Sequence, residues 1–174
     1  MWRRPYVPSE SSSQPKVMAV GIAPGETEEQ IGKPFSGSVG SVVREALSGM
    51  VGGDVYYTNL VKRRPINDDG KARKPSSREA SYCSRHLYEE MMSFKVPLVV
   101  TFGQLPTAYV MGDSEVQMEH VHGLAIQLER FGYTFILLPM YDPGHVARSG
   151  GLTGPTGTVW LDDLQELRNL VDGL

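Results

Sequence analysis

The stretch from residue 17 to residue 37, VMAVGIAPGETEEQIGKPFSG, constrains the fold more than any other part of the 174-residue sequence. It begins with four apolar residues, Val17 to Val20, which predict a strand covered on both faces of a parallel sheet. Gly21 and Gly25 follow, and glycines let a chain turn sharply and let backbone N–H groups approach a ligand. Because open α/β sheets bind ligands beyond the carboxyl ends of their strands, this turn is a candidate binding loop. An ordinary strand-to-loop turn has the same pattern, so the stretch alone assigns no function.

The composition excludes several classes of protein. With 40% hydrophobic and 21% charged residues, the chain is typical of globular domains. A single cysteine, Cys83, excludes an internal disulfide and cannot by itself build a zinc or iron–sulfur site. No apolar run approaches the roughly 18 residues of a membrane span, and the N-terminus lacks a signal-peptide core. We therefore expect a cytoplasmic monomer with no membrane partner and no metal.

The sequence predicts a flexible N-terminal arm at residues 1–16 and a single domain at residues 17–174. The arm is polar, contains three prolines and has a serine run at Ser11 to Ser13. The domain is long enough to bury a sizeable core without cross-links.

Strands and helices alternate in the predicted domain. After the first strand we expect a helix from Ser38 to about Gly49, a strand at 54–61 and a helix that opens with a Ser76–Glu79 capping box and has Cys83 on its apolar face. A strand at 98–103, a short helix at 104–111 and a hairpin turning at 130–132 follow. A final helix runs through Trp160 and Val171, with Asp162 and Asp163 near its start. This alternation predicts a three-layer α/β/α sandwich around a four-stranded, mainly parallel sheet. His120 and His122 have no further ligands nearby, so we interpret them as surface or hydrogen-bonding residues.

The loop from Lys62 to Arg78 is strongly basic. It holds seven Lys and Arg residues against only Asp68 and Asp69, a net charge of +5, whereas the whole chain carries −3 and the remainder therefore −8. A basic loop on an otherwise acidic protein attracts a polyanion, although a solvated loop has the same composition. Since it leaves the same end of the sheet as the first turn, we expect it to contact phosphates.

Three motifs would meet at this end of the sheet. They are Gly21-Ile22-Ala23-Pro24-Gly25 with Lys33-Pro34-Phe35-Ser36-Gly37, then Thr58-Asn59-Leu60-Val61-Lys62-Arg63-Arg64-Pro65, then Asp142-Pro143-Gly144-His145-Val146-Ala147-Arg148. In order and spacing this set resembles the uracil-DNA glycosylase superfamily, most closely its fourth, thermophile-type class. The resemblance covers roughly residues 17–150.

The resemblance implies a role for each motif. Phe35 would stack on a nucleobase flipped out of DNA, and Asn59 would read that base, because one amide both donates and accepts hydrogen bonds. The first turn, Ile22, Ala23, Pro24 and Gly25, would border the base. The residues expected at the DNA backbone or duplex are Gly37, Lys62, Arg63, Lys74, Val146 and Arg148. The partner implied is single- or double-stranded DNA, at the nucleoid.

The sequence also departs from the family pattern. Ile22 stands where this class has its catalytic Glu, and Ala23 stands where other classes have Asp or Asn. Asp142 replaces the histidine of the third motif. Three of the four cysteines that hold the iron–sulfur cluster of this class are missing, with Arg63 at one of their positions, so we expect no cofactor.

These departures leave the chemistry open. Cleaving an N-glycosidic bond requires a positioned water, an oxocarbenium-like sugar stabilised by negative charge, and a stabilised leaving base. Asp142, if protonated, would donate to the base, or it would activate water; His145 would supply a donor, and Glu26 is the nearest carboxylate of the first loop. We predict a glycosylase acting on uracil or a related modified pyrimidine in base excision repair. The alternatives are a module of the same fold that binds DNA or a base without turnover, and, more weakly, a small-nucleotide binder.

Overall fold

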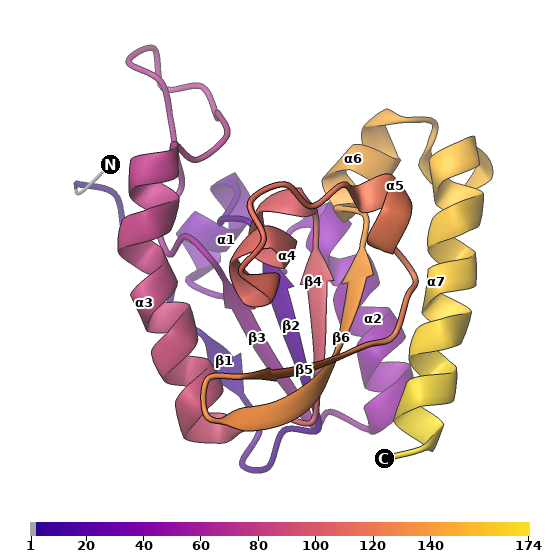
Figure 1. Cartoon of the computed structure of the whole chain (residues 1–174). Helices are drawn as coiled ribbons and strands as arrows, with labels where there is room; N and C mark the ends of the chain where they lie inside the picture. Colours follow the sequence, from indigo (N-terminus) through magenta and orange to yellow (C-terminus); the bar gives the residue numbers. More distant parts are fainter. Residues whose placement is uncertain (1–2) are drawn as a thin grey trace.

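A mixed sheet of six strands runs through the middle of the computed structural model, which describes residues 3–174 (Figure 1). The strands are β1 (Glu10–Ser11), β2 (Val17–Gly21), β3 (Val55–Asn59), β4 (Leu98–Phe102), β5 (Ile126–Arg130) and β6 (Tyr133–Met140). Their order is β1-β3-β2-β4-β6-β5. The four central strands are parallel, which confirms the predicted sheet, and β1 and β5 pair antiparallel at its two edges.

Helices cover both faces of the sheet. They are α1 (Glu26–Ile31), α2 (Ser38–Val51), α3 (Ser77–Phe94), α4 (Gln104–Met111), α5 (Met118–Val121), α6 (Pro143–Arg148), the 3-10 turn η1 (Gly151–Thr153) and α7 (Pro155–Asp172). One core cluster joins Val17 and Ala19 of β2 to α2 and α7, and another joins Met18 and Val20 to α3 and α4. Successive strand residues thus enter opposite cores, as the apolar run predicts. None of the helices in residues 3–174 combines the length and hydropathy needed to span a bilayer.

Residues 3–16 lie along the sheet edge, which differs from the flexible arm predicted for residues 1–16. Val7 is buried and its N–H donates to the Lys62 carbonyl at 2.8 Å. Glu10 and Ser11 form β1 beside β3, and the Ser9 hydroxyl lies 2.9 Å from that of Tyr56. The polar, proline-containing sequence does not predict these contacts, because the partner residues are distant in the chain. Residues 1 and 2 fall outside the described residues.

The last helix starts earlier than the sequence indicates. Because α7 begins at Pro155, Asp162 and Asp163 lie in its interior and not at its positive end, so that interpretation is wrong. Asp163 is buried and its carboxylate oxygens lie 3.1 and 3.2 Å from His122 Nδ1. Burial raises the pKa of Asp163, against the opposing effect of His122. His122 is therefore a hydrogen-bonding residue, as expected.

The capping box at the start of α3 also fastens the basic loop. The Glu79 N–H donates to Ser76 Oγ at 3.2 Å, and the Ser76 N–H donates to Glu79 Oε2 at 2.8 Å. The guanidinium of Arg73 donates to both oxygens of Glu79 at 2.7 Å. Mainly through this pairing with Arg73, the pKa of Glu79 falls to about 2.

We predict that Glu79→Gln weakens the fold in a pH-dependent way. A carboxylate whose folded pKa is depressed stabilises the fold fully above its unfolded value of 4.5 and progressively less as pH falls toward about 2. The variant should therefore lose about 1–3 kcal/mol of unfolding free energy near neutral pH and converge with the wild type near pH 2. Urea denaturation across this range measures the difference. The exposed Glu45→Gln is the control, and a loss independent of pH would contradict the role of the charge.

Candidate active site

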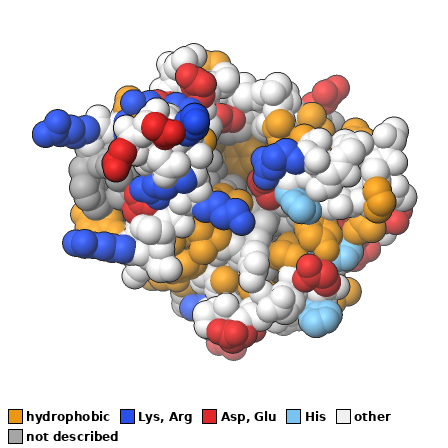
Figure 2. All heavy atoms as spheres, turned by 90° about the horizontal axis from the view of Figure 1, so that it is seen from above, with side chains coloured by type: hydrophobic (Ala, Val, Ile, Leu, Met, Phe, Trp, Pro, Cys, Tyr) orange, Lys and Arg blue, Asp and Glu red, His pale blue; other side chains and the backbone are white. Residues whose placement is uncertain are grey.

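A cleft of about 370 Å³ opens at the carboxyl ends of β2, β3 and β6. Figure 2 looks down on this end of the molecule, where the surface is hollowed between charged and apolar side chains. The cleft is lined by Gly21, Ile22, Ala23, Gly25, Glu26, Thr27, Glu28, Phe35, Gly37, Ser38, Val39, Gly40, Asn59, Asp142, Pro143, Gly144 and Arg148. The parallel sheet thus brings together residues from all three motifs. Pro24 is buried outside this lining.

Phe35 and Asn59 converge on Gly21. Gly21 ends β2 and is the register partner of Asn59, which ends β3. A Cβ on Gly21 would lie 2.3 Å from Asn59 Oδ1 and 3.0 Å from Phe35 Cζ, and Cβ atoms do not approach other atoms so closely. The position therefore tolerates only glycine while the amide and the ring keep their places.

The Phe35 turn is held from several sides. Phe35 has φ +54°, a left-handed conformation that non-glycine residues rarely adopt, and only 7% of it is exposed. Its ring packs against those of Tyr57 and Phe102, with centroids 5.9 and 5.6 Å away. Arg44 donates to the Pro34 carbonyl from Nε at 3.0 Å and from Nη2 at 2.6 Å. A strained conformation kept by surrounding contacts is common at functional sites.

Asp142 begins α6 on the other side of the cleft. Its Oδ2 accepts the His145 N–H at 3.0 Å and lies 3.9 Å from Arg148 Nη2. Burial raises the pKa of Asp142, whereas the N–H of His145 and the charge of Arg148 oppose the rise. Ile22 borders the same spot, because a Cβ on Gly103 would lie 3.0 Å from Ile22 Cδ1 and 3.3 Å from Asp142 Cβ. The apolar side chain of Ile22 and the side chain of Asp142 thus approach the same position, next to Gly103.

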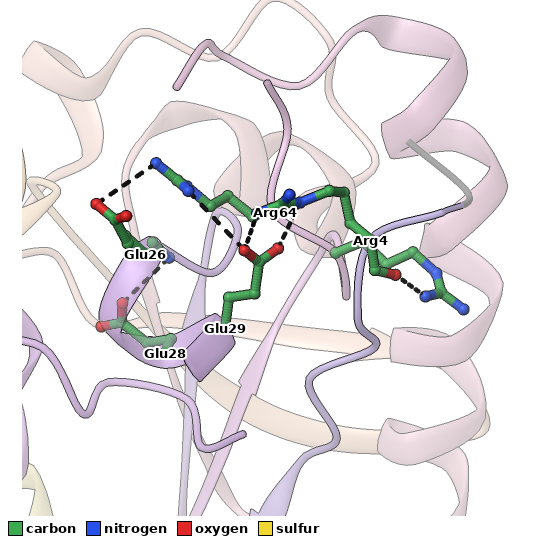
Figure 3. Close-up of polar contacts among 7 residues, drawn as sticks. Arg4, Glu26, Glu28, Glu29 and Arg64 are labelled. Carbon is green, nitrogen blue, oxygen red and sulfur yellow. Dashed lines mark hydrogen bonds and ion pairs between the residues drawn. The ribbon is translucent and has the colours of Figure 1, made fainter. Parts of the chain in front are cut away.

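The remaining catalytic candidates lie at the margins. His145 is exposed, lies beside the Tyr141 ring at 5.9 Å, and borders a second groove of about 480 Å³. That groove shares Ile22, Asp142 and Arg148 with the cleft. Glu26 is exposed at the cleft edge, where its Oε2 lies 3.9 Å from Arg64 Nη2 (Figure 3).

Several residues expected at the DNA lie elsewhere. Only 1% of Lys62 is exposed, and its ammonium lies 2.9 Å from both oxygens of Glu90, so it offers no charge to a phosphate. The Arg63 guanidinium donates to the Arg4 carbonyl and lies over the Tyr6 ring at 5.6 Å. Lys62 and Val146 are both buried, so these two expected contacts are corrected, whereas the half-buried Arg63 stays a prediction.

Val146 packs in the core with α2 and α7, at 4% exposure, and cannot enter a duplex without leaving it. In contrast, Lys74 and Arg148 are exposed and both line the second groove, and Gly37 lies in the cleft. These three positions and Arg63 stay predicted contacts with DNA.

An ion-pair cluster anchors the first loop from behind (Figure 3). Glu29 of α1 pairs with Arg4 of the N-terminal segment, with Arg4 Nε 2.9 Å from Glu29 Oε2. Arg64 Nη1 lies 3.9 Å from Glu29 Oε1, so one carboxylate joins the N-terminal segment to the loop that follows β3. The sequence gives no sign of this cluster because its members are far apart.

Comparison with known proteins identifies the family of this cleft. Residues 8–164 match the model described as the uracil DNA glycosylase superfamily. The chain belongs to this superfamily. A type-4 uracil-DNA glycosylase of Saccharolobus solfataricus is 33% identical over 148 residues, which cover 82% of this chain and 67% of that protein. One from Pyrobaculum aerophilum is 33% identical over 158 residues, covering 88% and 79%, and one from Thermotoga maritima is 26% identical over 171 residues, covering 97% and 84%.

The iron–sulfur cluster of the type-4 class does not fit the residues of this superfamily member. Such a cluster needs four thiolates, and the chain has one cysteine, Cys83, which is buried. Arg63 stands at a cysteine position, and its guanidinium is engaged by the Arg4 carbonyl and the Tyr6 ring. Among the described residues no group of three or more His, Cys, Asp or Glu side chains is placed to hold a metal.

We predict that Gly21→Ala displaces the Asn59 amide and destabilises this superfamily fold by about 1–3 kcal/mol, the usual cost of overpacking. The new Cβ would meet Asn59 Oδ1 at 2.3 Å. Urea denaturation and the NMR shift of the Asn59 side-chain amide measure the two effects. Gly49→Ala is the matched control, because a Cβ there meets nothing within 4 Å and alanine favours the helix. Equal stability of the two variants would contradict the close approach at Gly21.

Proposed function

We propose that this superfamily member is a DNA glycosylase that excises uracil, or a related modified pyrimidine, from DNA in base excision repair. The observation that carries the proposal is the convergence of the Phe35 ring and the Asn59 amide at Gly21, within one cleft that also holds Asp142. The names of the relatives, type-4 uracil-DNA glycosylases, support the same reaction. Such a role places the protein with the nucleoid, inside the cell.

The cleft has the parts needed to recognise a flipped pyrimidine. An aromatic ring offers a stacking face for any base, so Phe35 binds a flipped base without selectivity for its identity. The amide of Asn59 donates to a carbonyl and accepts from a ring N–H, which matches O4 and N3–H of uracil and not the amino group of cytosine. Because Asn59 is nearly buried, an unsatisfied partner there is costly, and this cost gives selectivity.

Asp142 is assigned to the sugar side of the reaction. Its bond from the His145 N–H and its approach to Arg148 favour the carboxylate over the carboxylic acid. A carboxylate accepts a proton from an attacking water and stabilises an oxocarbenium-like sugar, while it cannot donate to the leaving base. Ile22 and Asp142 both line the cleft, and both approach the Cβ position of Gly103.

The leaving base is then stabilised by neutral donors. As the N-glycosidic bond breaks, its electron pair goes to the pyrimidine, and the negative charge spreads over the ring oxygens. The Asn59 amide is a neutral donor in the cleft lining for such a ring. His145, which is exposed beside Tyr141, completes the set when the bound nucleotide excludes water.

Incubation with single-stranded and duplex oligonucleotides containing uracil, hydroxymethyluracil or thymine, followed by alkaline cleavage, tests the proposal. Strand breaks at uracil or hydroxymethyluracil, and none at thymine, are expected. The runner-up is a module that binds such DNA without turnover, favoured by Ile22 at the position of the catalytic Glu. Tight binding of uracil DNA with no cleavage would establish that alternative, and equal binding of all three DNAs would exclude both.

We predict that Asn59→Asp impairs uracil recognition far more than overall DNA binding. The carboxylate lacks the amide donor for O4 and brings a charge that must be desolvated. Discrimination between uracil and cytosine DNA should fall by roughly one to two orders of magnitude, as expected for about 1–3 kcal/mol, because cytosine has an amino group in place of O4. Competition titration at one salt concentration measures this discrimination. Phe35→Ala is the comparison, because it should weaken the binding of both DNAs and leave the discrimination between them unchanged. Equal weakening of both DNAs would reduce Asn59 to a structural cap of β3.

We predict that Asp142→Asn lowers kcat by about 10²- to 10⁴-fold and removes the acid limb of the pH–rate profile. Burial raises the pKa of Asp142 above 3.8, and the reaction needs the ionised form. Wild-type activity should therefore be present above that raised pKa and lost as pH falls through it. Single-turnover rates across pH measure this, with the exposed Asp162→Asn as control. Activity lost instead as pH rises would assign Asp142 as a proton donor.

A further inference from the structure

We propose that Glu28 is a positioning residue that fixes the base-stacking ring of Phe35 against the first turn. The inference rests on the proposed function, because it assigns a role within the same cleft. Glu28 lies in the cleft lining, and neither the family motifs nor the charge pattern of the sequence singles it out. It is distinct from Glu26 and Asp142, the other two carboxylates of the cleft lining.

The Glu28 carboxylate accepts hydrogen bonds from both the first turn and the end of the connection between α1 and α2. Glu28 Oε2 accepts the N–H of Gly25 at 3.1 Å, and Oε1 accepts the N–H of Gly37 at 2.9 Å. Gly25 is the N-cap of α1 and Gly37 is the N-cap of α2. Figure 3 shows the carboxylate turned back toward the start of its own helix. An anion at the start of a helix is favoured by the helix dipole, and here two helix starts share it.

The glycines at these two positions make room for the carboxylate. A Cβ on Gly25 would lie 2.7 Å from Glu28 Oε2, and a Cβ on Gly37 would lie 2.8 Å from Oε1. Neither glycine has a positive φ, so space and not backbone conformation requires them. Two glycines fitted around one carboxylate indicate that the bridge belongs to the native arrangement of the cleft.

The bridge acts on Phe35 through the short connection between α1 and α2. This connection leaves α1 at Gly32 and enters α2 after Gly37, with Phe35 at φ +54° between them. Arg44 holds its middle at the Pro34 carbonyl, and the body of α2 approaches the Phe35 backbone at Gly40, where a Cβ would lie 2.5 Å from Phe35 Cα. Only Glu28 ties its end to the Gly21–Gly25 turn, among the hydrogen bonds of the described residues.

The ring therefore depends on Glu28 for its place relative to Gly21 and Asn59. Phe35 Cζ approaches the Cβ position of Gly21 at 3.0 Å, and a shift of the connection moves the stacking face away from the base. Displacements on the order of 1 Å in a positioning element reduce rates by about 10²-fold. Loss of the bridge should act on base binding and on kcat, while the two core clusters stay intact.

The test uses Glu28→Gln and Glu28→Ala, with Gln30→Ala, exposed on the same helix, as the matched control. The measurements are kcat and KM on uracil DNA, the affinity for a uracil oligonucleotide that carries a non-cleavable 2′-fluoro sugar, and Tm. We expect Glu28→Gln to lower this affinity about tenfold, since one of its two bonds loses an acceptor, and to change Tm little. Gln30→Ala should match the wild type in all of them.

Added formate separates positioning from general destabilisation. In Glu28→Ala the carboxylate site between Gly25 and Gly37 is vacated, and formate is small enough to bind both N–H groups. We expect formate to restore part of the affinity for the uracil oligonucleotide in Glu28→Ala and to leave Glu28→Gln unchanged. An unaltered affinity in Glu28→Gln overturns the proposal, and so does a fall in affinity and Tm together that formate does not reverse.

Failure of the proposed function gives a different result. If the wild type neither cleaves uracil DNA nor prefers it, the function is wrong, and the bridge is then judged from amide hydrogen exchange. Glu28→Ala should raise the exchange of the Gly25 and Gly37 amides at least tenfold without affecting amides of β2. Unchanged exchange at both glycines would overturn the positioning role independently of any activity.

Discussion

The cleft depends on Gly21, which has no Cβ and therefore lets two side chains approach the end of β2. Where β2 ends, the Asn59 amide and the Phe35 ring approach the same point from two sides, at 2.3 and 3.0 Å from a Cβ that is not there. Neither group can be placed without the parallel register that sets Gly21 opposite Asn59. The fold and the site are therefore linked at one position: the strand pairing that builds the core also delivers a hydrogen-bonding amide and a stacking ring to one opening.

The region behind this opening is held by charge pairs whose members are distant in the sequence. Arg4, Glu29 and Arg64 join the N-terminal segment, α1 and the loop after β3, while Arg73 and Glu79 fasten the far end of that loop to α3. Arg63 adds a further link between these segments, because its guanidinium lies over the Tyr6 ring at 5.6 Å. Ion pairs are strongest where they are shielded from water, as Glu29 is.

The parts of this structure that follow from local pattern were predictable. The apolar run at β2, the Ser76–Glu79 capping box and the alternation of strands and helices all act within a few residues, and the structure confirms them. The net +5 of residues 62–78 includes one charge, that of Lys62, that does not reach the surface. Counting charges along the chain does not reveal that Glu90, 28 residues from Lys62 and on another element, neutralises its ammonium inside the core.

In the candidate site, too, some features follow from the sequence pattern and others depend on contacts between distant residues. Motif order places Phe35, Asn59 and Asp142 at one end of the sheet, because strand ends meet wherever the sheet is parallel. The direction of a side chain within a short helix does not follow from motif order. Val146 turns into the core in α6 while Arg148 stays 74% exposed. Glu28 escaped the sequence analysis because an acidic run looks like a solvated turn until its two N–H partners are known.

The neighbouring pair Ile22 and Asp142 gives the cleft its particular chemistry. Where the type-4 class has Glu and His, this chain has an apolar side chain and a carboxylate, and the two lie over Gly103. At these two positions the acid thus stands in the third loop and not in the first, so their number of carboxylates is conserved. Burial raises the pKa of Asp142, and the hydrogen bond from the His145 N–H orients its carboxylate. Those two properties suit a group that accepts a proton from water beside a cationic sugar. The departures from the family pattern are thus consistent with a relocated carboxylate and do not by themselves indicate a lost activity.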